Sequence, residues 1–358
     1  MLQPLVTVPI VGMELEAFAV LLIAALAGGA FGAALGALPS FVFTGFVVFL
    51  GEGIAILQDE IGSEIGVAGA GDIATGITGT IGFGAVTGPH IAFAGGVAAT
   101  AYAGRTYPEM EPNDWDYHFG KDILYAFGTK PDILAVGAVF GAVGMLITRV
   151  MGGLGFPTDN IALSVVATAF LARLAFGYPI VGKVGGSSVL DMSPFEREEK
   201  RMAADGGTET DRLATEPWLP HQYKWSGVTA IGIVGGLLGG YIWLETGSYF
   251  MGYAISAMSL LFLNLGVEKI PVTHHITLLG TVGAVIAMPA MGSELVALLA
   301  AGAFGAISGL LGEVSQRVFY SHSGTHVDPP AMAIAEFMLV LGVLYLVGLL
   351  PNAGYLSL

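Results

Sequence analysis

Ionisable side chains within long apolar runs are the residues of this sequence best placed to do chemistry. Glu52 lies in the run FLGEGIAIL, and Glu336 lies in the run AMAIAEFMLV. Such residues are costly in a membrane, and they usually bind ions, carry protons or meet a partner. Glu336, about eight residues into its run and so near mid-depth, is the better candidate for a cation or proton site. The structural alternative is a protonated glutamate that joins two helices by a hydrogen bond.

Two histidines stand at matching places in the two halves of the chain. His90 begins HIAFAGGVAA and His275 begins HITLLGTVGA, and these segments agree at five of ten positions. Helix-breaking or capping residues precede each histidine, at 87–89 and at 271–273. They predict helices that begin inside the membrane boundary with their positive ends inward. The alternative is a pair of packing histidines that bond neighbouring carbonyl groups.

Each half also has an aspartate at the mouth of its last apolar run, Asp159 in the first half and Asp328 in the second. With His90 and His275 they form a two-fold arrangement. Because related positions of inverted repeats meet around the central site of many transporters, we expect these side chains to border a pathway.

A short motif at 69–72, Gly-Ala-Gly-Asp, raises an enzymatic alternative. It fits the GxGD pattern and so resembles one half of the active site of intramembrane aspartyl proteases, which include presenilin-like and prepilin-type peptidases. The resemblance implies a catalytic role for Asp72. These enzymes need a second aspartate on the preceding helix to share a proton, and the upstream candidate here, Asp59, lies in the polar turn LQDE. A hydrolase centred on Asp72 is therefore the second hypothesis.

A second motif combines possible metal ligands in the loop SHSGTHVDPP, where His322, His326 and Asp328 follow one another closely. These residue types suit a divalent metal, but a flexible loop is the simpler interpretation. The chain has no cysteine, which excludes thiolate metal sites and disulfides. We expect neither a metal nor a cofactor.

The composition indicates that most of the chain lies in lipid. Of the 358 residues, 54% are hydrophobic and 11% are charged, and the mean hydropathy is +0.75. A soluble globule is excluded, and an all-α integral membrane protein is expected. Ten apolar segments have the length of about 20 residues that crosses a membrane as a helix: 15–38, 40–57, 86–103, 131–151, 158–177, 226–246, 248–265, 270–290, 294–314 and 329–350.

The internal similarity predicts two membrane repeats, at 1–177 and 225–358, joined by a solvated polar linker at 178–224. Five helices per repeat is an odd number, so the second repeat must be inverted. The Gly-rich stretch at 61–84 is an insertion in the first repeat. Irregular backbone at membrane depth must pack in protein or line a wet cavity, so we expect a re-entrant hairpin that enters from outside. The alternative is that Ala- and Gly-rich helices match by composition alone.

Basic residues predict the orientation in the cell membrane. Twelve of the 13 Lys and Arg residues lie on the linker side and only Arg149 lies opposite, which makes the linker cytoplasmic and the C-terminus extracellular. The outer face is acidic and would attract cations; the alternative is the surface chemistry of a salt-loving organism. The formal net charge of -15 argues against nucleic acid as a partner.

Small residues recur at three- and four-residue spacing, as in GIVGGLLGG and AAGAFGAISG. This spacing lets helices approach closely, so it predicts a dense bundle and allows a homo-oligomer. The segment at 28–53, GGAFGAALGALPSFVFTGFVVFLGEG, resembles the opening of multi-spanning membrane proteins of haloarchaea to which no function is attached. The resemblance implies a membrane location and a saline habitat.

The sequence thus favours a secondary transporter or channel for a small solute or cation rather than an enzyme. Asp72, His90, His275 and Glu336 are expected to line its path. The third hypothesis is a membrane scaffold without catalysis.

Overall fold

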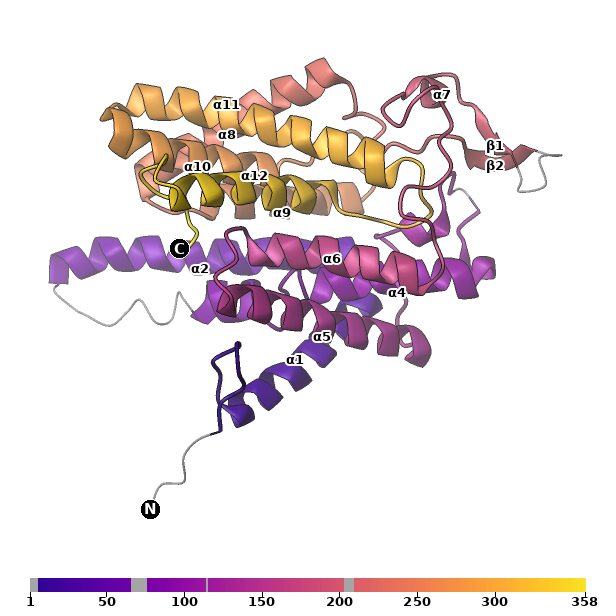
Figure 1. The fold of residues 1–358 in the computed structure, drawn as a ribbon, viewed down its shortest axis with the longest axis horizontal. Helices are drawn as coiled ribbons and strands as arrows, with labels where there is room; N and C mark the ends of the chain where they lie inside the picture. Colours follow the sequence, from indigo (N-terminus) through magenta and orange to yellow (C-terminus); the bar gives the residue numbers. More distant parts are fainter. Residues whose placement is uncertain (1–5, 66–75, 114, 203–208) are drawn as a thin grey trace.

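The computed structural model describes residues 6–65, 76–113, 115–202 and 209–358, and they form helices with one short β-hairpin (Figure 1). The first half contains α1 (Leu15–Leu35), α2 (Ala37–Ile65), η1 (Gly76–Gly82), α4 (Ala92–Thr106), η2 (Pro108–Met110), η3 (Phe119–Lys121), α5 (Pro131–Gly153) and α6 (Asn160–Ala175). The second half contains α8 (Trp225–Thr246), α9 (Met251–Asn264), α10 (His274–Met291), α11 (Glu294–Ser315), η4 (Gln316–Tyr320) and α12 (Pro329–Leu346). Between them lie α7 (Ser193–Glu196) and the antiparallel strands β1 (Lys200–Met202) and β2 (Glu209–Leu213).

Seven of the described helices are long and apolar enough to cross a membrane, namely α1, α2, α5, α8, α10, α11 and α12. Two shorter apolar helices, α6 and α9, and the 15-residue α4 occupy the other predicted segments. The prediction of an all-helical protein is therefore confirmed, and seven of its described helices are candidates to cross a membrane.

The helices pack as two bundles. One bundle holds α1, α4, α5 and α6, and the other holds α8, α10, α11 and α12. Contacts of α2 with α9 and of α6 with α12 join the bundles, and Figure 1 shows the two groups as a lower and an upper layer.

Glycine allows the closest of these helix contacts. A Cβ atom at Gly141 of α5 would lie 2.7 Å from the Cα atom of Gly29 in α1. A Cβ atom at Gly236 of α8 would lie 2.9 Å from the Cα atom of Gly305 in α11. Backbones therefore touch in both bundles, as the spacing of small residues predicts.

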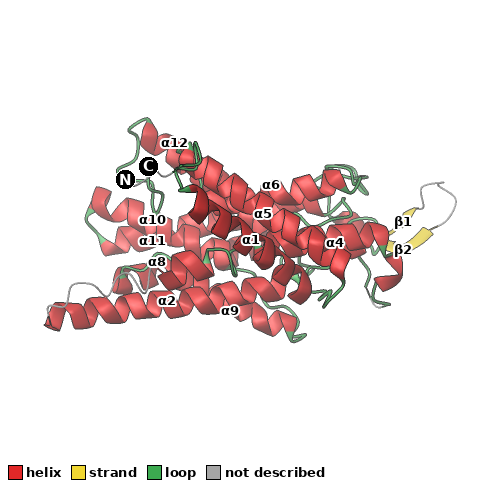
Figure 2. Cartoon of the chain, turned by 90° about the horizontal axis from the view of Figure 1, so that it is seen from below, coloured by secondary structure: helices red, strands yellow, loops and turns green. Residues whose placement is uncertain are grey.

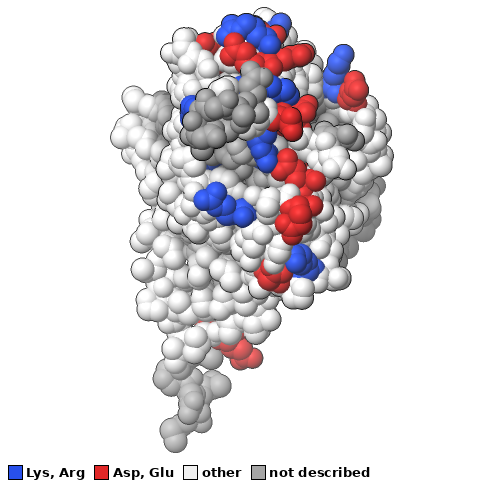
Figure 3. Space-filling model, turned by 90° about the vertical axis from the view of Figure 1, so that its right-hand side faces the viewer, with Lys and Arg blue, Asp and Glu red and all other residues white. Residues whose placement is uncertain are grey.

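The outer surface of the helices is apolar. Val20 and Ile23 of α1 are 63% and 68% exposed, and Leu299 of α11 is 62% exposed. Charged side chains gather on the end of the molecule that carries the β-hairpin, and the flanks in that view are largely uncharged (Figure 3). The C-terminus lies at the opposite end (Figure 2). An apolar belt with a charged end suits a membrane-embedded protein.

The glycine-rich insertion differs from the prediction at its first boundary. Residues 61–65 continue α2 rather than starting a new segment, because no glycine pair or proline interrupts the helix there. The next described element, η1, packs back along α2, where the Thr78 hydroxyl donates a 3.1 Å hydrogen bond to Glu52. Asp72 lies outside the described residues.

Candidate functional site

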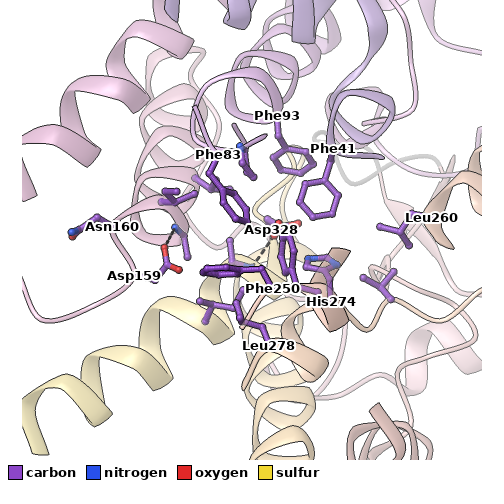
Figure 4. Close-up of a pocket in the computed structure, with 18 of the residues that line it drawn as sticks. Phe41, Phe83, Phe93, Asp159, Asn160, Phe250, Leu260, His274, Leu278 and Asp328 are labelled. Atoms are coloured by element: carbon purple, nitrogen blue, oxygen red, sulfur yellow. Dashed lines mark hydrogen bonds between the residues drawn. The ribbon is translucent and has the colours of Figure 1, made fainter. Parts of the chain in front are cut away.

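A cavity of about 280 Å³ lies where the two bundles meet. Both halves of the chain line it: α2, α4 and α6 from the first, and α9, α10 and α12 from the second. Most of the wall is aromatic or aliphatic, and Figure 4 shows the polar groups Asp159, Asp328 and His274 among these side chains. Apolar walls with a few convergent polar groups are typical of binding sites for small molecules.

The two aspartates predicted from the sequence are both in this cavity, and each caps a helix. Asp159 accepts a 2.8 Å hydrogen bond from the backbone N–H of Ala162 at the start of α6. Asp328 accepts a 2.8 Å hydrogen bond from Ala331 at the start of α12. Aspartate is among the best N-cap residues, because its carboxylate satisfies a free N–H group near the positive helix end.

The start of α6 lies well inside the protein. The hydroxyl of Thr158 donates a 2.6 Å hydrogen bond to the carbonyl of Ala335, which stands about 10 Å along α12 from Asp328 at the usual rise per residue. Helix α6 therefore begins beside the middle of α12. The first turns of α6 and α12 therefore both border the cavity, but they begin at different depths in the protein.

The second oxygen of each aspartate contacts the polar atom of an aromatic ring. The Tyr355 hydroxyl donates a 2.7 Å hydrogen bond to Asp159. The Nε2 atom of His326 lies 3.3 Å from Asp328. Tyr355 belongs to the tail that follows α12, so the C-terminal residues fold back onto the cavity.

His274, which the sequence analysis passed over, lines the cavity, whereas its neighbour His275 does not. The His274 ring lies 4.7 Å from the ring of Phe41 and 5.6 Å from that of Tyr253. Its side chain is 6% exposed, and its Nδ1 atom has no hydrogen-bond partner among the described residues. One signal was available, since consecutive histidines on a helix must point in different directions. Helix α10 is buried on nearly all sides, so its sequence pattern does not indicate which histidine faces the cavity.

Of the other predicted site residues, the four that the structure describes do not line the cavity. His90 and His275 are buried beside glycines, and Glu336 is half-buried on α12 without a hydrogen bond or ion pair to another described residue. Glu52 accepts hydrogen bonds from Thr78 and, at 2.5 Å, from Ser248. The structure thus gives Glu52 the role of joining α2 to η1 and to the start of α9.

A buried ion pair closes the charged end and was not predicted. The Nζ atom of Lys121 lies 2.7 Å from Glu216, and neither side chain is exposed. The Nδ1 atom of His118 lies 2.7 Å from the other Glu216 oxygen. Glu216 comes from the segment predicted to be a solvated linker. That prediction is wrong for this part, because residues 213–216 and 219 are buried against the helix ends.

The pKa values of this pair follow from burial and mutual attraction. Burial lowers the pKa of Lys121 to about 8, against the opposing charge of Glu216. Burial alone would raise the pKa of Glu216, but Lys121 and His118 outweigh it and hold the pKa at about 2. Both side chains are therefore charged at neutral pH, and each depends on the other.

The loop after η4 is also buried rather than flexible. Arg173 of α6 donates hydrogen bonds of 2.7 and 2.8 Å to the side chain and carbonyl of Thr325. His322 bonds the carbonyl of Val189, whereas His326 faces Asp328. The described residues therefore hold no group of three His, Asp or Glu side chains arranged for a metal ion.

A comparison with protein families matches residues 10–358 to the Family of unknown function (DUF7973), and the chain belongs to that family. Comparisons with curated proteins and with solved structures give no match.

Proposed function

We propose that this member of the family is a secondary transporter whose ten described helices cross the membrane and whose central cavity binds a small solute. The observation that carries the proposal is the cavity between the bundles, bordered by Asp159 and Asp328. Helix starts near the midplane, at the boundary between two repeats, are typical of transporter binding sites.

Equivalent contacts within the bundles support an inverted five-plus-five repeat. A Cβ atom at Gly32 of α1 would overlap the carbonyl oxygen of Ala92 in α4, and one at Gly239 of α8 would overlap that of Thr277 in α10. Residues 92 and 277 differ by 185 positions, as do 90 and 275.

The same correspondence extends to the next helix of each bundle. A Cβ atom at Gly144 of α5 would overlap the carbonyl oxygen of His90. Ser308 of α11 donates a 3.1 Å hydrogen bond to the carbonyl of His275. In addition, α6 ends toward the β-hairpin and α12 ends toward the C-terminus (Figure 1), as inversion of the second repeat requires.

Closure at both ends would let such a cavity alternate between the two sides of the membrane. Trp218 and Leu219 of the linker border it from the charged end, and Tyr355 and Leu356 border it from the C-terminal tail. Rocking of one bundle against the other would open one of these borders at a time. By the distribution of basic residues, the linker border is cytoplasmic.

Transport tests the proposal directly. We expect liposomes that contain the full chain to show an electrical current across their membrane when sodium, choline, phenethylammonium, acetate or phenylacetate is added outside. Asp159→Asn and Asp328→Asn should each lower this flux about tenfold or more, because asparagine keeps the helix cap and removes the charge. Asp72→Asn, measured in the same assay, tests the predicted pathway role of the insertion.

The matched control is Glu294→Gln, which removes an exposed carboxylate near the start of α11, away from the cavity. Its flux should equal that of the unaltered chain. The proposal would be contradicted if no probe gave a flux, or if both Asn variants gave the same flux as the unaltered chain.

Cysteine labelling tests the predicted path of the insertion in the membrane. The chain has no native cysteine, so Ser63→Cys and Gly76→Cys, placed on either side of residues 66–75, can be labelled singly with an impermeant reagent. We expect both to react from outside and Lys183→Cys, in the linker, to react only from the cytoplasmic side. Labelling of residues 63 and 76 from opposite sides would show that the insertion crosses, and the inverted repeat would have to be abandoned.

A further inference from the structure

The cavity wall is a network of aromatic rings from both halves of the chain. Phe41 lies 5.9 Å from Phe93 and 6.0 Å from Tyr253, in edge-to-face arrangements. Phe83 lies 5.1 Å from Phe250 and 5.6 Å from Tyr253. In Figure 4 the rings of Phe41, Phe83 and Phe93 lie on one side of Asp328, and Phe250 and His274 lie on the other. Ring faces attract cations, most strongly where water is excluded.

The charge of the cavity also favours a cation. Its lining includes two carboxylates, Asp159 and Asp328, and no Lys or Arg among the described residues. The positive ends of α6 and α12, each equivalent to roughly half a unit charge, offset only part of this. An anion would meet two carboxylates, and a neutral solute would leave them without a counter-charge in an apolar site.

A bare metal ion does not suit this site. Such ions need several oxygen ligands at short range, and the described residues hold no suitable group of three. An organic cation differs, because its apolar part can pack on the rings while its N–H groups reach separate acceptors. The Nδ1 atom of His274, buried and without a partner among the described residues, is one available acceptor in its unprotonated form.

We propose that the cavity binds a small organic cation, an ammonium group on an apolar or aromatic body, with its charge between Asp328 and Asp159 and its body against Phe41, Phe83 and Phe93. This inference rests on the proposed transport function and names its substrate class. The volume of about 280 Å³ lies just below the range of roughly 300–1,000 Å³ for small-molecule pockets, so the substrate is a small amine rather than a drug-sized ligand.

Calorimetric binding to the purified full chain separates the ligand classes. The probes are phenethylammonium, the neutral 2-phenylethanol, phenylacetate and sodium chloride. We expect phenethylammonium to bind at least tenfold more tightly than 2-phenylethanol, and phenylacetate and sodium not to compete with it. Equal binding of the alcohol, or tighter binding of phenylacetate, would overturn the assignment.

Variants locate the binding. Asp328→Asn and Asp159→Asn should each weaken phenethylammonium binding at least tenfold while leaving 2-phenylethanol unaffected, since they remove charge and keep the cap. Phe41→Leu should weaken the cation more than the alcohol, because leucine offers apolar surface without a ring face. Glu294→Gln is again the control and should change neither. Unchanged cation affinity in both Asn variants would place the binding elsewhere and overturn the proposal.

Failure of this inference is distinguishable from failure of the transport proposal. If acetate or phenylacetate flux depends on Asp159 and Asp328 but phenethylammonium does not bind, the transport proposal stands and the cation site is overturned. If phenethylammonium binding depends on both aspartates but no probe gives a flux, the cation site stands and the transport proposal is overturned.

Discussion

Glu216→Gln is expected to destabilise the protein by roughly 3–5 kcal/mol, which would appear as a large fall in the melting temperature of the detergent-solubilised chain. The change leaves Lys121 buried with no carboxylate beside it, so its amine must either hold an unpaired charge in an apolar site or give up its proton. His118 would lose the same partner. Breaking one side of a buried pair costs more than the pair contributes, because the remaining ionisable group stays out of water without its partner.

Two variants test the assignment of this effect to burial. The double variant Glu216→Gln with Lys121→Met should recover much of the lost stability, since no unpaired ammonium is left. Glu199→Gln is the control, because its ion pair with Arg197 is exposed and exposed pairs contribute little. A double variant no more stable than Glu216→Gln alone would refute the buried-pair explanation.

The stability that depends on Glu216 should also vary with pH in a defined window. Its pKa is about 2 in the folded chain, against an ordinary value of 4.5. A depressed carboxyl pKa stabilises the folded state above the ordinary value, and this contribution is lost as the pH falls from 4.5 toward 2. The difference in melting temperature between the unaltered chain and Glu216→Gln should therefore shrink over that range. A difference independent of pH would contradict the depressed pKa.

Gly239→Ala is expected to destabilise the second bundle by roughly 1–3 kcal/mol, as overpacking of a close contact does. The added Cβ atom would overlap the carbonyl oxygen of Thr277. Backbone cannot rotate away as a side chain can, so α8 and α10 must separate. Gly32→Ala should act alike in the first bundle, where the overlap is with Ala92.

The control lies on the same helix. Gly227 of α8 is exposed, and no described atom lies within 4 Å of a Cβ added there. Gly227→Ala should therefore be neutral or slightly stabilising, because alanine favours the helix more than glycine does. Thermal unfolding of the three variants in one detergent compares them. Equal melting temperatures for Gly239→Ala and Gly227→Ala would show that the helices do not approach as closely as described.

The sequence alone was sufficient to predict where the helices lie and to identify two of the residues that line the cavity. Runs of about 20 apolar residues can satisfy their backbone groups in lipid only as helices, and ten helices occur where those runs lie. Asp159 and Asp328 were recognisable because each lies at the mouth of the last apolar run of its half, and the structure shows that each caps the helix that follows. The prolines that follow Asp328 mark the same helix start.

Contacts between distant segments could not be predicted in this way. Glu216 lies 95 positions after Lys121, and its charged surroundings resemble those of any solvated loop. The side chains of His274 and His275 differ only in the direction in which they leave α10. A helix that is buried on nearly all sides has no polar face from which its orientation could be predicted. Residues 61–65 looked like an insertion because glycine lowers helix propensity, whereas they continue α2.

Local chemistry therefore determined where the helices of this protein begin, which residues cap them and that lipid surrounds them, because these properties depend on neighbours in the chain. Tertiary structure decided that both capping aspartates share one aromatic cavity and that a buried ion pair closes the charged end. Those features depend on which helices pack together, and that choice arises from close backbone contacts at glycines such as Gly29 and Gly236, whose partners the sequence does not name.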